Sequence, residues 1–176
     1  MRLKITTMFK TFTPMRPELV LAVDPGYERL GLAILKRNPK KDVLLISLCA
    51  RTSKELTLPE RIGILSKEVV QLLNEHKPDA LAMERIYFSK SRSTAMGVAE
   101  VRGMLETLAA QHGIPVFQYS PQEVKIAITG YGASDKKAIA SMLPSLIELS
   151  AKKRLDDELD AIAVGITCLA STRLLT

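Results

Sequence analysis

The chain has 176 residues, of which 47% are hydrophobic and 25% are charged, and its formal net charge is +6. This length suits one domain with a substantial core, and the lack of any apolar run of about 18 residues predicts no transmembrane helix. Two cysteines and two histidines, widely separated in the sequence, exclude a disulfide framework and a zinc site of ordinary spacing. The basic balance favours a polyanionic partner.

The charge is concentrated at the start of the chain. Residues 1–17 carry four basic residues and no acid, so they supply +4 of the net charge. We interpret residues 1–17 as an N-terminal extension and residues 18–176 as a single domain. The composition of the extension also resembles an organelle transit peptide, which we weigh at roughly one in six against a short tail or a later start at Met15. With no apolar secretory segment in the sequence, we expect a cytoplasmic, bacterial-type protein.

The first half of the chain predicts a meander followed by a helix and a strand. Strands are predicted at 19–23, 31–36 and 43–50, with turns at Asp24-Pro25-Gly26 and Asn38-Pro39. Apolar residues three and four apart predict a helix at 59–75. The run at 80–83 has no polar alternation, so we expect a strand that is covered on both faces.

The second half alternates helices and strands. A helix is predicted at 93–112, where Met96, Val101 and Met104 lie outside the tightest core stripe and form a candidate dimer surface. A strand follows at 116–119 and a helix at 121–129. The next helix begins after a cap at Ser134 and runs to about 143, where Pro144 interrupts it. The last helix is predicted at 157–171. The order predicts an α/β fold with a mixed five-stranded sheet flanked by helices.

Four acidic residues lie at the ends of predicted elements. Asp24 follows the first strand, Glu84 follows the fourth, and Asp157 and Asp160 open the last helix. Taken singly, each has a simpler explanation in a turn, a strand end or the helix dipole, at roughly two in three. Taken together they predict a divalent-metal site, because carboxylates at the edge of a core need a cation or another partner. In a basic chain, this site predicts a metal-dependent nuclease.

Four short motifs, taken in order and spacing, resemble one known family. They are Val23-Asp24-Pro25-Gly26, Ala82-Met83-Glu84-Arg85, Gln122-Glu123-Val124-Lys125 and Asp157-Glu158-Leu159-Asp160. On these motifs the chain resembles the RuvC-type Holliday-junction resolvases of the ribonuclease-H-like superfamily, over residues 19–172. The resemblance implies a ribonuclease-H-like fold, a homodimer, a magnesium requirement, a four-way DNA junction as substrate and a branch-migration helicase complex as a partner.

The resemblance also implies residue roles. The four acids match the catalytic tetrad that holds the metal, Lys125 and Lys136 match basic positions near the scissile phosphate and the DNA backbone, and Tyr87 matches an aromatic position that stacks near the crossover. Further candidate DNA contacts lie in or beside the motifs: Arg85, Lys90, Arg92, Arg102 and Tyr131. The chain departs from the family pattern in its extension, in the loop at 88–92, and at Tyr87, where phenylalanine is common.

The donor set suits phosphodiester hydrolysis. Two Mg²⁺ ions about 3.5–4 Å apart clamp the attacking and leaving oxygens of an in-line displacement. Mg²⁺ prefers oxygen ligands, and Mn²⁺ is the expected substitute. The resemblance implies that Asp24 bridges both ions. Our hypothesis is that Glu84 and Asp160 hold one ion each, while Asp157 completes the set or orients the water.

Three other functions compete with junction cleavage. Another ribonuclease-H-like nuclease, acting on flaps, RNA–DNA hybrids or structured RNA, would carry the same acids. An inactive scaffold for branched nucleic acid is disfavoured because all four acids are present. An actin-like ATP-binding protein shares the early Asp-Pro-Gly turn but would need a far longer chain and a second phosphate loop.

Overall fold

The computed structural model describes residues 16–85 and 92–172, and only the backbone of residues 92–94. Its first three strands form the predicted meander: β1 (Leu19–Asp24), β2 (Arg29–Lys36) and β3 (Asp42–Arg51). β1 and β2 pair antiparallel, with Asp24 opposite Gly31. β2 and β3 also pair antiparallel, with Arg29 opposite Arg51. The last residues of β1 therefore lie at the same edge of the sheet as the start of β2 and the end of β3.

Three more strands complete the sheet, in the order β5-β4-β1-β2-β3-β6. β4 (Ala80–Glu84) is parallel to β1, and β5 (Val116–Tyr119) is parallel to β4. β6 (Ile147–Glu148) has two residues and pairs with the first two of β3. The predicted mixed α/β sheet is confirmed, but its count of five strands was wrong. A two-residue strand directly after a helix is too short to produce a periodic signal.

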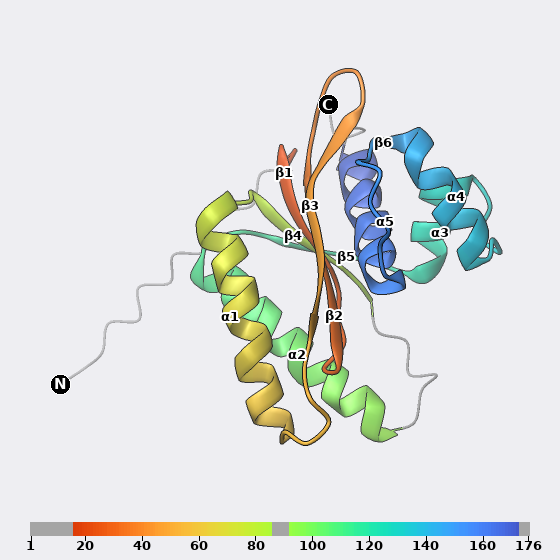
Figure 1. Cartoon of the computed structure of the whole chain (residues 1–176). Coiled ribbons are helices and arrows are strands. Elements are labelled where there is room, and N and C mark those ends of the chain that lie inside the picture. The colour runs from red at the N-terminus through yellow and green to blue at the C-terminus, as the bar shows by residue number, and fades with distance from the viewer. Residues whose placement is uncertain (1–15, 86–91, 173–176) are drawn as a thin grey trace.

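Helices cover both faces of the sheet (Figure 1). α1 (Leu58–His76) and α2 (Arg92–Gln111) cover one face, and α5 (Asp156–Ser171) covers the other, with α3 (Pro121–Thr129) and α4 (Lys136–Leu146) packed beside it. The sheet is built differently on its two faces. Large side chains such as Leu32 and Ile34 point towards α1 and α2, whereas Ala22, Ala33 and Ala82 point towards α5. The small residues let α5 lie close to the central strands.

Helix α4 departs from its prediction at both ends. Its cap is Asp135, whose side chain accepts a hydrogen bond from the backbone of Ala138, and not Ser134. The hydroxyl of Ser134 donates instead to the carbonyl of Tyr131, at 2.8 Å. The helix also continues past Pro144 to Leu146. Both Ser134 and Asp135 suit the capping position by residue type. Asp135 takes it because the hydroxyl of Ser134 is hydrogen-bonded to the Tyr131 loop.

Helix α2 corrects part of the predicted dimer surface. Val101 is fully buried in the core between α2 and the sheet, so it cannot contribute to a surface. Met104 is partly buried against the same core, whereas Met96 is 66% exposed. Among the helices in the described ranges, none has the length and hydrophobicity to cross a bilayer.

Candidate active site

Asp24 and Glu84 lie side by side at the carboxyl edge of the sheet. They follow Val23 and Met83, which are partners in the parallel β1–β4 ladder. Side chains alternate along a strand, so Asp24 lies on the same face as Ala22, and Glu84 on the same face as Ala82. That is the face covered by α5. The strand geometry therefore brings the two predicted acids together beneath the start of α5.

The first turns of α5 add Asp157 and Asp160 to this edge. Gly31, the partner of Asp24 across the β1–β2 ladder, makes their approach possible. A Cβ placed on Gly31 would lie 2.0 Å from the backbone oxygen of Asp157. Only glycine leaves room for the helix here, so Gly31 sets the distance between α5 and the carboxylates of the sheet.

The four acids act on one another electrostatically. The pKa of Asp24 is raised to about 7, first by burial and then by the charges of Asp160, Glu84 and Asp157. Lys136 opposes this rise. The Lys136 ammonium lies 2.6 Å from Oδ2 of Asp160, and this hydrogen bond raises the pKa of the lysine. Lys136 therefore offsets part of the repulsion among the acids.

Asp157 is held from the strand side. Its Oδ2 lies 3.4 Å from Nη1 of Arg29, and its side chain is 13% exposed. The thiol of Cys49 donates to the same oxygen at 3.8 Å. Because Cys49 is opposite Gly31 in the β2–β3 ladder, the groups around Asp157 come from neighbouring positions on two strands.

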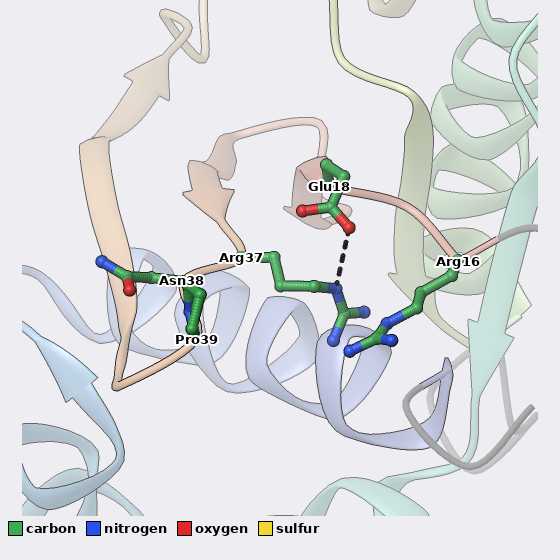
Figure 2. Close-up of a pocket in the computed structure, with 5 residues that line it drawn as sticks. All are labelled: Arg16, Glu18, Arg37, Asn38 and Pro39. Carbon is green, nitrogen blue, oxygen red and sulfur yellow. Dashed lines mark ion pairs between the residues drawn. The ribbon is translucent and has the colours of Figure 1, made fainter. Parts of the chain in front are cut away.

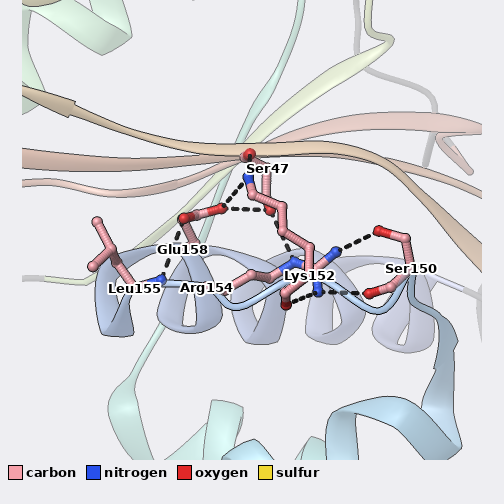
Figure 3. Close-up of polar contacts among 6 residues, drawn as sticks. All are labelled: Ser47, Ser150, Lys152, Arg154, Leu155 and Glu158. Atoms are coloured by element: carbon pink, nitrogen blue, oxygen red, sulfur yellow. Dashed lines mark hydrogen bonds and ion pairs between the residues drawn. The ribbon is translucent and has the colours of Figure 1, made fainter.

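A polar network fixes the start of α5 on β3 (Figure 3). Glu158 is buried, and its Oε2 accepts a hydrogen bond from the hydroxyl of Ser47 at 2.7 Å and lies 3.4 Å from Nζ of Lys152. Its Oε1 accepts from the backbone of Leu155, and Arg154 donates to the Ser47 hydroxyl at 3.1 Å. A buried carboxylate with this many donors is strongly oriented, so the network sets the rotation of the turn that carries Asp157.

Arg102 holds the ends of β4 and β5 together through hydrogen bonds. Its Nη1 donates to the backbone oxygen of Glu84, and its Nη2 donates to Oε1 of Gln118 at 2.9 Å. The side chain is only 9% exposed. The expectation that Arg102 meets DNA phosphates was therefore wrong, because its donors are committed to the ends of β4 and β5.

The turn after Asp24 is also fixed by packing. The ring of Tyr27 lies against Gly97 of α2, where a Cβ would come within 2.7 Å of the ring. The Thr52 hydroxyl donates to the carbonyl of Tyr27 at 2.7 Å, and the Arg61 guanidinium lies 5.7 Å from the centre of the ring. Tyr27 is thus half-buried and holds the turn in place.

The predicted DNA contacts are placed unevenly. Arg85 is exposed and donates to the carbonyl of Gln118 at 3.2 Å, and Tyr131 is 66% exposed beside α3. Lys125 is half-buried on α3 and is not among the charges that shift the pKa of Asp24. Tyr87 and Lys90 lie outside the described residues, as does the side chain of Arg92.

The donor chemistry at this edge fits a hard divalent cation. All four predicted ligands offer carboxylate oxygens, which Mg²⁺ and Mn²⁺ prefer. The raised pKa of Asp24 reflects its burial and, after that, repulsion by the other three acids, and a bound cation would offset both. Within the described ranges no group of three or more Asp, Glu, His or Cys side chains is arranged so that it could hold a metal ion together.

A cavity lies at the opposite end of the sheet (Figure 2). It has a volume of about 400 Å³ and is lined by Arg16, Glu18, Arg37, Asn38 and Pro39. Nε of Arg37 lies 3.7 Å from Oε1 of Glu18. These residues precede β1 and follow β2, so the cavity is separated from the acidic edge by the length of both strands.

Comparison with known proteins decides the family. The family model of the crossover junction endodeoxyribonuclease RuvC matches residues 20–168. The chain belongs to the RuvC family. A RuvC of Thermosipho melanesiensis is 36% identical over 154 residues, spanning 88% of this chain and 98% of the relative. A RuvC of Thermotoga petrophila is 37% identical over 146 residues, spanning 83% of this chain and 88% of the relative.

Solved structures agree with this assignment. The structure of Thermus thermophilus RuvC superposes with a TM-score of 0.82 at 30% identity, covering 89% of this chain and 96% of that one. T. thermophilus RuvC in complex with Holliday junction substrate gives 0.81 at 29% identity, covering 88% and 97%. The family resemblance and the fold class predicted from the sequence are therefore confirmed.

Several residues around the RuvC-type acids were missed from the sequence. Glu158 lies inside a motif, but the sequence gives it no complete capping signal: its carboxylate accepts from the backbone N–H of Leu155, and leucine has no side-chain acceptor to return the bond. The role of Gly31 depends on the close approach of α5, which no local pattern shows. Arg29 and Cys49 carry no local signal, because their role follows from strand register.

Proposed function

We propose that the chain is a metal-dependent endonuclease that resolves four-way DNA junctions by paired symmetric nicks in homologous recombination and repair. Membership of the RuvC family supports the reaction and the substrate. The observation that supports the site is the convergence of Asp24, Glu84, Asp157 and Asp160: burial raises the pKa of Asp24, and the charges of the other three acids add to the rise, to about 7 in all. Strongly shifted carboxylates of this kind are typical of functional sites.

In this proposal the four carboxylates hold two Mg²⁺ ions, with Mn²⁺ as a substitute. Bound metal supplies an activated water and neutralises charge on the attacked phosphate. Asp24 lies centrally between β4 and the start of α5, which suits it to bridge both ions. Glu84 comes from β4 and Asp160 from α5, so each would hold one ion, and Asp157 would complete the set or orient the water.

Basic side chains of the chain then stabilise charge on the phosphate. Lys136 is 74% exposed and already reaches Asp160, so its ammonium lies where a phosphate oxygen would approach the acids. Lys125 is the second candidate for this role. Arg85 is exposed directly after Glu84, and Tyr131 is exposed in the loop after α3. We propose both as DNA contacts, together with Tyr87, Lys90 and Arg92.

Symmetric cutting of a junction suits two identical sites related by a two-fold axis. We therefore propose a homodimer that uses the exposed part of α2 around Met96, and a branch-migration helicase complex as a further partner. The bacterial relatives favour a bacterial cytoplasmic protein over an organellar one.

The substrate is tested by incubating the chain with a labelled four-way junction in Mg²⁺, beside a linear duplex, a 5′ flap and an RNA–DNA hybrid. Paired nicks at symmetric positions on the junction alone are expected. Preferential cutting of the flap or the hybrid would keep the nuclease but overturn the substrate. Tight binding to the junction without cutting in Mg²⁺ or Mn²⁺ would point to a scaffold.

A further inference from the structure

Two arginines lie beside the acidic edge on strands that the proposed mechanism does not use. Arg29 begins β2, Arg51 ends β3, and they face each other as partners in the ladder. Both are an even number of residues from the neighbouring pair Gly31 and Cys49, so all four lie on the face of the sheet covered by α5. The arginine pair therefore lies just beyond the start of α5, next to Asp157.

A contact of Arg29 and an electrostatic effect of Arg51 place both side chains near Asp157 and Cys49. Nη1 of Arg29 lies 3.4 Å from Oδ2 of Asp157. Burial raises the pKa of the Cys49 thiol and Asp157 raises it further, while both Arg51 and Arg29 oppose the rise. Arg29, Arg51 and Asp157 thus all act on one thiol.

The pair has cationic donors to spare. The side chain of Arg29 is 55% exposed, and Asp157 engages it through one nitrogen. Arg51 is exposed and forms no ion pair with any carboxylate of the described residues. The nearest other acid in sequence, Glu28, is shared between Lys54 at 3.7 Å and Arg61 at 3.8 Å. Among the described residues, Asp157 is therefore the carboxylate that lies beside the pair Arg29 and Arg51.

We infer that Arg29 and Arg51 bind a backbone phosphate of the junction strand on the β2–β3 side of the acidic edge. The inference rests on the proposed function, because a DNA phosphate is the ligand it names. The planar fork of arginine suits phosphate oxygens, and two adjacent forks can engage one group. Lys136 reaches Asp160 from α4, so the arginine pair provides the matching cation on the other flank. A strand held on both flanks is fixed in register over the carboxylates.

Binding to a labelled four-way junction tests the inference directly. Fluorescence anisotropy is measured with the full chain in EDTA, so that no cutting occurs, across a series of salt concentrations. The variants are Arg29→Gln, Arg51→Gln and the double variant, with Arg29→Lys and Arg51→Lys to keep the charge but lose the fork. Lys40→Gln is the matched control, because Lys40 is exposed in the turn between β2 and β3 at the opposite end of the sheet.

We expect the double variant to bind the junction about tenfold more weakly, and the slope of log affinity against log salt to fall by about one. The lysine variants should keep most of the slope, and the control should match wild type. An unchanged affinity and slope in the double variant would overturn the inference. Normal binding with slower cutting would also overturn it, because Arg29 would then act only on Asp157. Failure of wild type itself to bind the junction would instead overturn the proposed function.

Discussion

Replacing Gly31 with alanine tests how closely α5 must approach the sheet. The new Cβ would lie 2.0 Å from the backbone oxygen of Asp157 and 2.6 Å from its carbonyl carbon. To lengthen the 2.0 Å contact to the 3.4 Å of ordinary van der Waals contact, the first turn of α5 must move by about 1.4 Å. Both atoms are backbone, so no side chain can rotate to absorb the change.

The displacement acts on the two carboxylates carried by that turn. Overpacking of this kind costs about 1–3 kcal/mol of stability, and a displacement of about 1 Å at a catalytic group costs about 10²-fold in rate. We therefore expect Gly31→Ala to remain folded at 25 °C but to cut the junction about 10²-fold more slowly. Urea unfolding followed by circular dichroism gives the stability, and single-turnover cleavage in Mg²⁺ gives the rate.

Gly63→Ala is the matched control. Gly63 lies in α1, and a Cβ there meets no atom within 4 Å. Alanine is the better helix former, so this variant should be more stable by about 0.5–1 kcal/mol and should cut at the wild-type rate. If Gly31→Ala kept both the stability and the cleavage rate of wild type, the close approach of α5 would not be what positions Asp157 and Asp160.

Three further variants test the electrostatics and support of the site. Because the folded pKa of Asp24 is raised from 3.8 to about 7, the metal-free chain loses stability as pH rises through this interval. Asp24→Asn should therefore be more stable than wild type by a few kcal/mol at pH 8 in EDTA, and similar to it at pH 4. Equal urea midpoints at pH 8 would refute this. Lys136→Gln should slow junction cleavage by on the order of 10²-fold. It should change stability by less than about 1 kcal/mol, because the lysine is exposed. A normal single-turnover rate would remove Lys136 from the mechanism. Arg102→Ala should cost about 2–4 kcal/mol in urea unfolding, because it removes a buried side chain and its hydrogen bonds to Glu84 and Gln118. Arg85→Ala should cost less than about 0.5 kcal/mol, and equal costs would show that burial of Arg102 contributes nothing.

The sequence was sufficient to predict where the acids lie. Asp24 and Glu84 each follow an apolar run, and the carboxyl ends of neighbouring parallel strands meet at one edge. Asp157 and Asp160 are three residues apart on a helix, so they share a face. Local patterns and chain order therefore predicted the fold class, which the solved RuvC structures confirm. They also predicted that the acids lie near one another, as the electrostatic effect of the other three on Asp24 indicates.

Features that depend on distance between elements could not be predicted in this way. Arg102 and Val101 are adjacent in one helix, and the pattern alone did not show that α2 buries both against the sheet. The contact between Gly31 and Asp157 joins residues far apart in the chain. The same is true of Glu158 and Ser47, whose pairing follows from how α5 rests on β3. Such contacts follow from packing, which no single segment encodes.

The account rests on Asp24 as the central metal ligand of a junction resolvase. The most direct measurement compares wild type and Asp24→Asn on one labelled four-way junction, with cleavage in Mg²⁺ and binding in EDTA measured on the same preparations. The account predicts paired symmetric nicks by wild type, no cleavage above background by the variant, and junction binding by both. Cleavage of the junction by Asp24→Asn at the wild-type rate would contradict it.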